Sequence, residues 1–314
     1  MINLENEIVP HRTAKNVSTQ EEYKFIFEPL IYFSIFSFPL TLDEIFEYNQ
    51  SSKTKEEIKK ALDILVAKHL IYNTSKYYQL EENLNQINNR LIGENNYKRK
   101  KKRIKNVVKL IASFPYVESI NLSGSLSKGV WGKETDIDFF IITKKNKLWL
   151  CRTLLILFKK IFLFNNKKYF CINYLISDDN LIIPDKNIFT ATEISTLQNV
   201  YGTSIFELFI KENNWSKSFL PNTIQKESWN IKPFTSIFKK IVENIFSDYF
   251  SNKIDTFLLN QTLKRWKNKF GSLNKNNFDL NFRSLKSSSK HHPRGFQNVV
   301  LGKYNKGISE YCKK

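Results

Sequence analysis

The sequence predicts an α+β protein in which a small sheet lies between two helix-rich regions. Apolar runs of strand length lie at residues 116–122, 135–143 and 168–176. Apolar residues at helical spacing dominate the chain before and after these runs. At 314 residues the chain also exceeds the usual size of one domain, which is about 100–200 residues, so we expect several domains.

The N-terminal region is predicted to consist of a polar tail, residues 1–20, and a small domain, residues 21–82. Three helices followed by a hairpin are expected in this domain, and that order resembles a winged helix. Many winged helices bind DNA through the third helix. Here that helix mixes acidic and basic residues, so a packing or partner-binding role is equally open. The expected helices cover residues 23–37, 42–48 and 55–68, and the expected strands cover 69–72 and 77–80.

Residues 83–106 are predicted to form a basic linker helix. The segment is polar, and every residue from Lys98 to Arg103 is Lys or Arg. A solvated helix face explains such a run, because charge runs arise readily on exposed surfaces. The alternative is that the run lies beside the functional site and contacts phosphates or RNA.

The region from residue 116 to residue 143 carries the strongest functional signal. A first strand ends at Ser123-Gly124-Ser125, and a second strand begins near residue 135 with Asp136 and Asp138. Because side chains in a strand alternate between faces, the two carboxylates are expected on the same face. Neighbouring carboxylates repel each other unless a cation lies between them, and oxygen-ligated Mg²⁺ is the usual cation. We therefore expect both aspartates to bind metal.

The glycine–serine turn between the two strands is suited to phosphate binding. Gly124 permits backbone N–H groups to approach an anion closely, and a helix that begins there directs its positive end at the same anion. The Ser125 hydroxyl adds a further donor. Together, the turn and the carboxylates predict a phosphate-transfer site, in which paired metals hold the attacking and leaving oxygens.

This arrangement resembles the signature of the polymerase-beta-like nucleotidyltransferase superfamily. Gly124-Ser125, a ten-residue spacer and Asp136-Ile137-Asp138 match that signature without a gap. The resemblance implies a core at residues 107–185, with a mixed sheet, helices on one side of it, and Lys128 facing the triphosphate. It also implies Mg²⁺, or Mn²⁺ in its place, as the cofactor. A solvated edge strand after a glycine loop would explain the residues but not their spacing.

One position departs from the superfamily. The third strand usually brings a third carboxylate, which binds metal and takes the proton of the acceptor hydroxyl; here alternation points to Asn173. An amide oxygen can bind metal, but an amide cannot take the proton. Three functions are then open: an enzyme that needs no base, an enzyme that uses Asp178 or Asp179 as its base, and a nucleotide-binding protein without catalysis. The alternative without a function is that Asn173 has only a structural role at a sheet edge. Uncharacterised nucleotidyltransferase-like proteins with a winged-helix-like start and Asn-Tyr in this strand are similar over most of the chain.

The C-terminal part is predicted to comprise a helical domain, residues 186–283, and a basic tail, residues 284–314. Aromatic stripes at helical spacing indicate core packing in the domain. In the tail, His291, His292 and Arg294 are consistent both with a loop that closes over phosphates and with an ordinary exposed loop. The expected helices cover residues 190–200, 202–211, 234–250 and 254–270.

No stretch of the sequence is long and apolar enough to span a membrane. The nearest candidate, residues 148–164, is interrupted by Arg152 and Lys159-Lys160 and is shorter than the ~20 apolar residues required. The first residues carry no apolar signal core, and the three cysteines match neither a zinc pattern nor a paired disulfide framework. We expect a cytoplasmic protein with reduced thiols.

The composition excludes wholesale disorder and indicates affinity for anions. The chain is 41% hydrophobic, and 49 basic against 30 acidic residues give a net charge of +19. Only eight of the basic residues are arginine, and the chain is rich in Lys, Asn, Ile and Phe, which have AT-rich codons. Genome composition therefore contributes to the charge, and a nucleic-acid acceptor does not follow from it.

We therefore expect a nucleotide to be transferred from a nucleoside triphosphate to a hydroxyl group. The metal is expected on Asp136 and Asp138, and the phosphates at Gly124 and Ser125. The acceptor class stays open between a small molecule, a protein and RNA. The alternative is a non-catalytic nucleotide-binding or regulatory module, whose site is degenerate at Asn173.

Overall fold

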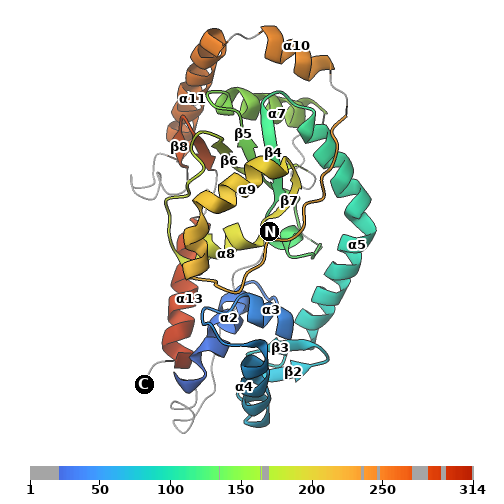
Figure 1. Cartoon of the computed structure of the whole chain (residues 1–314), viewed down its shortest axis with the longest axis vertical. Helices are drawn as coiled ribbons and strands as arrows, with labels where there is room; N and C mark the ends of the chain where they lie inside the picture. Colours follow the sequence, from blue (N-terminus) through green and yellow to red (C-terminus); the bar gives the residue numbers. More distant parts are fainter. Residues whose placement is uncertain are drawn as a thin grey trace.

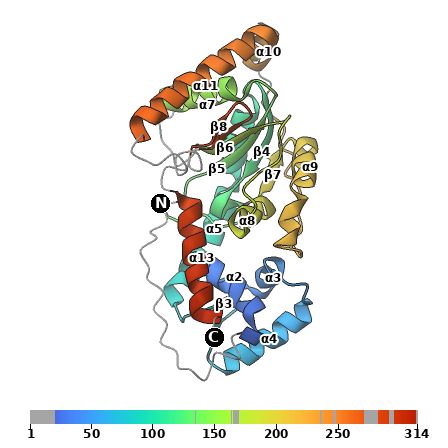
Figure 2. The same ribbon diagram turned by 90° about the vertical axis from the view of Figure 1, so that its left-hand side faces the viewer.

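The computed structural model of the chain describes residues 21–133, 135–162, 164, 170–234, 237–245, 248–270, 282–290 and 295–312, without the side chains of residues 173, 238, 248 and 249. The predicted tail at residues 1–20, and His291, His292 and Arg294, lie outside this part of the chain. Figures 1 and 2 show an N-terminal unit at one end of an elongated molecule and a sheet with its helices at the other. Two helices, α5 (Leu84–Ala112) and α13 (Phe296–Cys312), run between these ends.

The N-terminal unit contains the three predicted helices and the predicted hairpin. Thr41 and Thr54 begin the second and third of these helices, each through a capping box with a glutamate three residues later. A two-residue strand, β1, was not predicted, and the sheet order is β1-β3-β2, with both pairs antiparallel. The winged-helix-like interpretation of this unit stays a prediction. The elements are α2 (Lys24–Ser34), β1 (Leu40–Thr41), α3 (Leu42–Glu47), α4 (Lys55–Ala67), β2 (Tyr72–Thr74) and β3 (Tyr77–Gln79).

The predicted linker helix and the first helix of the predicted core form one continuous helix, α5. It has 29 residues, which corresponds to a length of about 43 Å at 1.5 Å per residue. Ile104, Val108 and Ile111 near its C-terminal end are fully buried in the core beneath the sheet. Arg90 near its N-terminal end donates to the backbone oxygen of Pro39 in the N-terminal unit at 3.2 Å. The helix therefore fixes the N-terminal unit to the sheet.

A mixed six-stranded sheet forms the centre of the second part of the molecule. Its order is β7-β4-β5-β6-β9-β8, in which β5 and β6 are parallel and the other pairs are antiparallel. The sheet and its helices confirm the predicted α+β class. The strands are β4 (Val117–Leu122), β5 (Asp138–Thr143), β6 (Cys171–Ser177), β7 (Gln198–Tyr201), β8 (Ser284–Leu285) and β9 (Ser288–Lys290).

Helices cover both faces of this sheet, whereas the sequence predicts helices on one side. On one face α5, α7 (Leu148–Phe162) and α11 (Asp248–Phe270) pack over a core that includes Phe139 and Ile141. On the other face Phe140 and Ile142 pack with α8 (Ile188–Thr196) and α9 (Thr203–Glu212). Because strand β5 is apolar on both faces, both need a cover. The described part also contains η2 (Asn214–Ser218) and α10 (Ile237–Ile245).

The C-terminal elements differ from the prediction in three places. The helices predicted at 234–250 and 254–270 are replaced by α10, which spans Ile237–Ile245, and α11, which spans Asp248–Phe270. The helix predicted at 190–200 ends at Thr196, because Leu197 has an extended backbone, and the next residues pair with β4 as strand β7. The predicted basic tail contains β8, β9 and α13. Tyr304 and Tyr311 of α13 enter the same core as α2, so a stripe of apolar residues within a lysine-rich segment is enough to order it.

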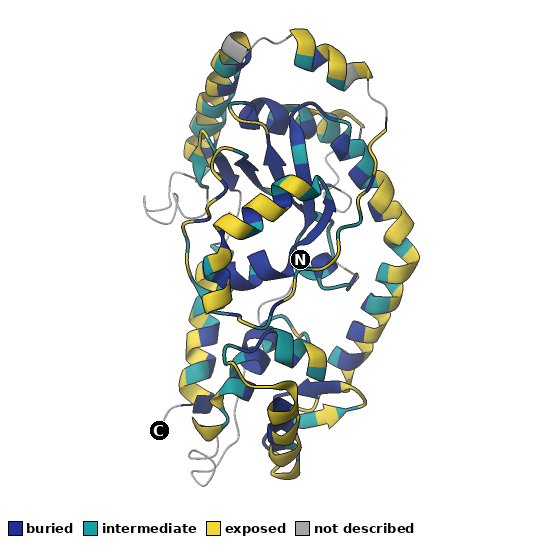
Figure 3. Cartoon of the chain, in the orientation of Figure 1, coloured by how far each residue is buried: buried dark blue, intermediate teal, exposed yellow. Residues whose placement is uncertain are grey.

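The outer side of α5 is largely exposed, as Figure 3 shows. The exposed residues there include Lys98, Arg99 and the three residues from Lys101 to Arg103. Lys100 and Lys101 place their ammonium groups 4.8 Å and 4.7 Å from the ring centres of Trp131 and Trp229. Within the described part of the chain, no helix combines the length and the hydropathy needed to cross a bilayer.

Candidate active site

The predicted glycine–serine turn joins β4 to a single helical turn, α6 (Gly124–Ser127). Gly124 has a φ of 64°, in the left-handed region that favours glycine. The backbone N–H of Ser123 donates to the backbone oxygen of Asp138 at 3.0 Å, which ties the turn to the start of β5. The fold thus holds the two halves of the motif side by side.

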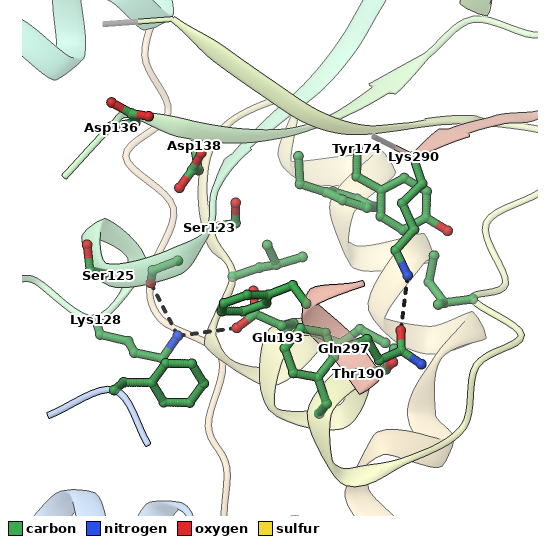
Figure 4. A pocket seen from close by; sticks show the side chains of 18 of the residues that line it. Ser123, Ser125, Lys128, Asp136, Asp138, Tyr174, Thr190, Glu193, Lys290 and Gln297 are labelled. Atoms are coloured by element: carbon green, nitrogen blue, oxygen red, sulfur yellow. Dashed lines mark hydrogen bonds and ion pairs between the residues drawn. The ribbon is translucent and has the colours of Figure 1, made fainter. Parts of the chain in front are cut away.

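The close approach of Asp138 to the turn also requires a glycine. A Cβ atom built at Gly124 would lie 3.1 Å from Oδ2 of Asp138, tighter than ordinary van der Waals contact. The Asp138 carboxyl group is therefore directed at the turn, as Figure 4 also shows. A phosphate held at the turn would lie beside this carboxylate.

A methyl group at Gly124 should disturb the site more than the fold. Gly124→Ala is expected to weaken Mg²⁺-dependent nucleotide binding at least about tenfold, because the methyl displaces the Asp138 carboxylate. Gly129→Ala is the matched control: its φ of 76° brings a similar backbone cost, but among the described atoms none lies within 4 Å of its Cβ position. Calorimetric titration should separate the two variants, while their melting temperatures fall similarly. Equal losses of binding would show that the contact with Asp138 is unimportant.

The structure brings every predicted site residue whose side chain is described to one cavity of about 520 Å³. Asp136 and Asp138 line it and are both partly exposed, whereas Ile137 between them is fully buried, as strand alternation requires. Gly124 lines the same cavity. Ser125 and Lys128 line it as well (Figure 4).

Lys128 is anchored inside the cavity, and its side chain is only 9% exposed. Its ammonium group donates to the backbone oxygen of Gly124 at 3.2 Å and lies 3.6 Å from Oε1 of Glu193 on α8. The Ser125 hydroxyl lies 3.4 Å from that of Thr135. Glu193 was not predicted, because nothing in the sequence places a helix 65 residues downstream beside the turn.

The pKa of the Cys171 thiol is affected by the negative charges of Asp136 and Asp138. Cys171 is the partner of Asp138 in the β5–β6 register. Burial, together with the charges of Asp138 and Asp136, raises the pKa of the Cys171 thiol to about 12. Both carboxylates therefore lie close enough to Cys171 to affect the pKa of its thiol.

Asn173 lies in β6, but its side chain is outside the described part of the structure. The β5–β6 register shifts between Phe139, which pairs with Ile172, and Phe140, which pairs with Tyr174. Asn173 is thus the extra residue of a bulge, and simple alternation does not assign its face. Its role at the site stays a prediction.

The substitute bases considered from the sequence, Asp178 and Asp179, lie outside the cavity. They follow the far end of β6, about six residues or roughly 20 Å along the strand from the residue beside Asp138. Asp178 accepts from the backbone N–H of Lys145 at 2.8 Å, and Asp179 accepts from Ser177 at 2.5 Å. The suggestion that either serves as the base is therefore wrong.

The donor set at Asp136 and Asp138 fits a hard cation such as Mg²⁺. Over the described residues, no group of three or more His, Cys, Asp or Glu side chains is arranged to hold a metal. Mg²⁺ does not need one, because it is commonly held by one or two carboxylates plus substrate phosphates and water. Two carboxylates beside a glycine–serine turn that could hold substrate phosphates fit that requirement.

The remaining walls of the cavity are rich in aromatic residues and come from elements distant in the sequence. They include the end of α2, the loop after it, strand β6, helices α8 and α9, and the start of α13. The sequence offers no signal for this arrangement, since each residue belongs to an ordinary apolar stripe. The aromatic residues that line the cavity are Tyr32, Phe33, Phe36, Phe38, Phe140, Tyr174, Phe189, Phe209 and Phe296.

The comparison with protein families agrees with this geometry. Residues 101–197 match the model of the nucleotidyltransferase domain. The match covers the end of α5, the turn, both aspartates, β6 and α8. This match supports a polymerase-beta-like nucleotidyltransferase domain in the chain. Neither a curated protein nor a solved structure matches the chain.

Proposed function

We propose that this nucleotidyltransferase domain transfers a nucleotide from a nucleoside triphosphate to a hydroxyl group in the presence of Mg²⁺ or Mn²⁺. One observation carries the proposal: the Asp138 carboxylate lies against the Gly124 turn, with Asp136 on the same cavity. A metal-binding pair and a phosphate-binding turn at contact distance are what transfer from a triphosphate needs.

Each residue has a distinct part in the proposed reaction. The turn at Gly124 and Ser125 binds the triphosphate through backbone N–H groups and the hydroxyl, and the nearby Lys128 adds positive charge. Asp136 and Asp138 hold the metal, which offsets the charge that develops on the phosphates. The acceptor oxygen bonds to the α-phosphorus, the bond from that phosphorus to the bridging oxygen breaks, and pyrophosphate leaves. The hydroxyl proton passes to water or to a base.

A second candidate function follows from the amide at Asn173. If its amide replaces the usual third carboxylate, metal binding weakens and the base is missing, whereas the turn still binds triphosphate. A nucleotide-binding or regulatory module without catalysis follows from the same site. Both functions share the nucleotide, and they differ only in turnover.

Turnover is tested by incubation with each labelled nucleoside triphosphate and Mg²⁺ or Mn²⁺. The parent protein is expected to release pyrophosphate slowly. Asn173→Asp should raise the rate, by up to the 10²–10⁴-fold typical of general-base catalysis, because a carboxylate can take the hydroxyl proton. Pyrophosphate release and labelling of any acceptor are measured together.

The outcome separates the two functions. Binding of nucleotide and metal without turnover, in both the parent and Asn173→Asp, would favour the non-catalytic module. A faster Asn173→Asp variant would support the enzyme and place residue 173 at the acceptor hydroxyl. Absence of Mg²⁺-dependent nucleotide binding would contradict both.

A further inference from the structure

The cavity has an acidic end and a cationic end. Asp136 and Asp138 lie at the first end, and Lys290 lies at the other (Figure 4). The Lys290 ammonium group is 3.7 Å from Oδ2 of Asp185, and Arg283 Nη2 is 2.8 Å from Oδ1 of the same carboxylate. Among the described side chains at this end, two cations thus share one carboxylate. One positive charge is in excess there.

Lys290 is held inside the protein with its charge only partly balanced. It is 6% exposed, and it donates to Oε1 of Gln297 at 3.0 Å, which is a neutral partner. Burial lowers the pKa of Lys290, against the attraction of Asp185, and Arg283 lowers it further. A buried cation that lacks a full counter-charge is costly, and an anionic group of a ligand would supply that charge.

In-line transfer places the acceptor on this cationic side. The attacking and leaving oxygens lie on opposite sides of the α-phosphorus. The proposed site holds the leaving pyrophosphate at the turn after β4, so the acceptor approaches Asp138 from the direction of β6 and β9. Those strands carry Tyr174 and Lys290, which line the cavity.

The strand spacing sets the length of the acceptor. Phe140 on β5 pairs with Tyr174 on β6, and Tyr174 pairs with Lys290 on β9. Two strand spacings of about 4.8 Å separate β5 from β9, and Asp138 lies two residues, or about 7 Å, before Phe140 along β5, so the backbones of Asp138 and Lys290 are roughly 12 Å apart, a distance that their two side chains shorten. A molecule that reaches both is about the length of one aromatic ring with a short substituent.

The walls between the two ends fit an apolar body of that size. Phe33 and Phe38 of the N-terminal unit, Phe189 of α8 and Phe296 of α13 line the same cavity. At about 520 Å³ the cavity falls in the range of about 300–1,000 Å³ that is usual for small-molecule sites. Aromatic walls pack well against flat apolar groups.

We propose that the acceptor is a small hydroxy acid: an apolar, ring-sized body whose hydroxyl lies at Asp138 and whose carboxylate lies at Lys290. This inference rests on the proposed nucleotidyl transfer and adds the class of acceptor. The hydroxyl oxygen of the acid takes the nucleotide, pyrophosphate leaves, and the carboxylate is unchanged.

Binding and transfer are tested with para-hydroxyphenylacetate and its neutral analogue para-hydroxyphenylacetamide. Each is titrated calorimetrically into the full chain, alone and with Mg²⁺ and a non-hydrolysable nucleoside triphosphate. The acid is expected to bind at least about tenfold more tightly than the amide, as a charge-assisted contact with a buried ammonium group should provide. Transfer of labelled nucleotide is then compared among the acid, the amide, an RNA with a free 3′-hydroxyl, and the protein itself.

Two variants test whether Lys290 causes the preference for the acid over the amide. Lys290→Met keeps the length of the side chain and leaves the Arg283–Asp185 ion pair in place, so it should abolish the preference for the acid. Gln297→Glu keeps Lys290 but supplies a carboxylate to it at the position of the present 3.0 Å contact, and the preference should again disappear. Melting temperatures show whether each variant is folded, and nucleotide binding should persist in both.

The outcomes for the acceptor and for the proposed function are distinct. If nucleotide binds with Mg²⁺ but acid and amide bind equally, or RNA or protein is labelled in preference, the hydroxy-acid acceptor is wrong and nucleotidyl transfer stands. An acid preference that survives both variants would also overturn the role of Lys290. If no nucleotide binds with Mg²⁺, nucleotidyl transfer fails, and the titrations without nucleotide still decide whether the cationic end binds the acid.

Discussion

Asp138→Asn is expected to lower metal-dependent nucleotidyl transfer by about 10²–10³-fold. A bound metal contributes several kcal/mol to stabilising the charge of the transition state, and each 1.36 kcal/mol corresponds to a factor of ten in rate. Asp138 begins β5 and lies against the Gly124 turn, so its charge is at the point where the proposed metal and phosphate would meet. Nucleotide binding that depends on Mg²⁺ should fall in parallel.

The fold should survive this change, because a neutral amide removes the repulsion between Asp138 and Asp136. Asp136→Asn is expected to have the same direction of effect, since both carboxylates line the cavity. Asp179→Asn provides the control: it removes a carboxylate from the far end of β6, outside the cavity, and activity should not change. Unaltered metal-dependent binding in Asp138→Asn would contradict the two-carboxylate metal site.

Arg90→Met is expected to destabilise the protein by about 3–5 kcal/mol, which is the usual effect of breaking one side of a buried ion pair. The Arg90 side chain is 5% exposed, and it lies 2.6 Å from Glu44 and 2.9 Å from Glu94. Its guanidinium group is also 3.8 Å from the ring centre of Phe38, which lines the cavity. Urea unfolding should therefore show lower stability, and the hydroxy acid should bind more weakly.

Arg99→Met, an exposed substitution on the same helix, should change stability by no more than about 0.5 kcal/mol.

The effect of Arg90→Met should also depend on pH. Burial acts to raise the pKa of Glu94, but hydrogen bonds from Tyr77 and Arg90 and the charges of Arg90 and Lys76 hold it below its usual value of 4.5. The stabilisation is present above that value and is lost as the pH falls through the lower folded pKa. The difference between parent and variant should accordingly be largest near neutral pH and should shrink as the pH falls below 4.5. A difference independent of pH would exclude Glu94 as its source.

The signature of the site could be predicted from the sequence because it is local. The Gly-Ser turn and the aspartates lie within 15 residues of each other, and the strands that carry them differ sharply in pattern from the loop between them. Most of the helices and the central strands were predicted for the same reason. Strand β7 was missed because its four residues directly follow a helix with apolar spacing.

The end of the cavity that carries Lys290, and its aromatic wall, could not be predicted. Lys290, Phe38 and Phe296 come from distant elements, and each fits a local role as a surface charge or a core residue. Only the pairing of β9 with β6 and the packing of α13 against α2 bring them together. The lysines of residues 284–314 led to the prediction of a basic tail, although the apolar stripe within this segment forms the ordered helix α13.

The packing of α13 on α2 has a consequence for biosynthesis. Gln50 donates to the hydroxyl of Tyr304 at 2.7 Å although the two are 254 residues apart, and Gly307 packs so closely on Ile31 that a Cβ there would lie 2.5 Å from its Cγ2. Domains generally fold as units as they emerge from the ribosome, and the turn and the aspartate strand are translated about 150 residues before α13. The growing polypeptide cannot close the aromatic wall of the cavity until residues 296–312 have been translated. Discrimination between acceptors by that wall would therefore begin only after α13 has packed on α2.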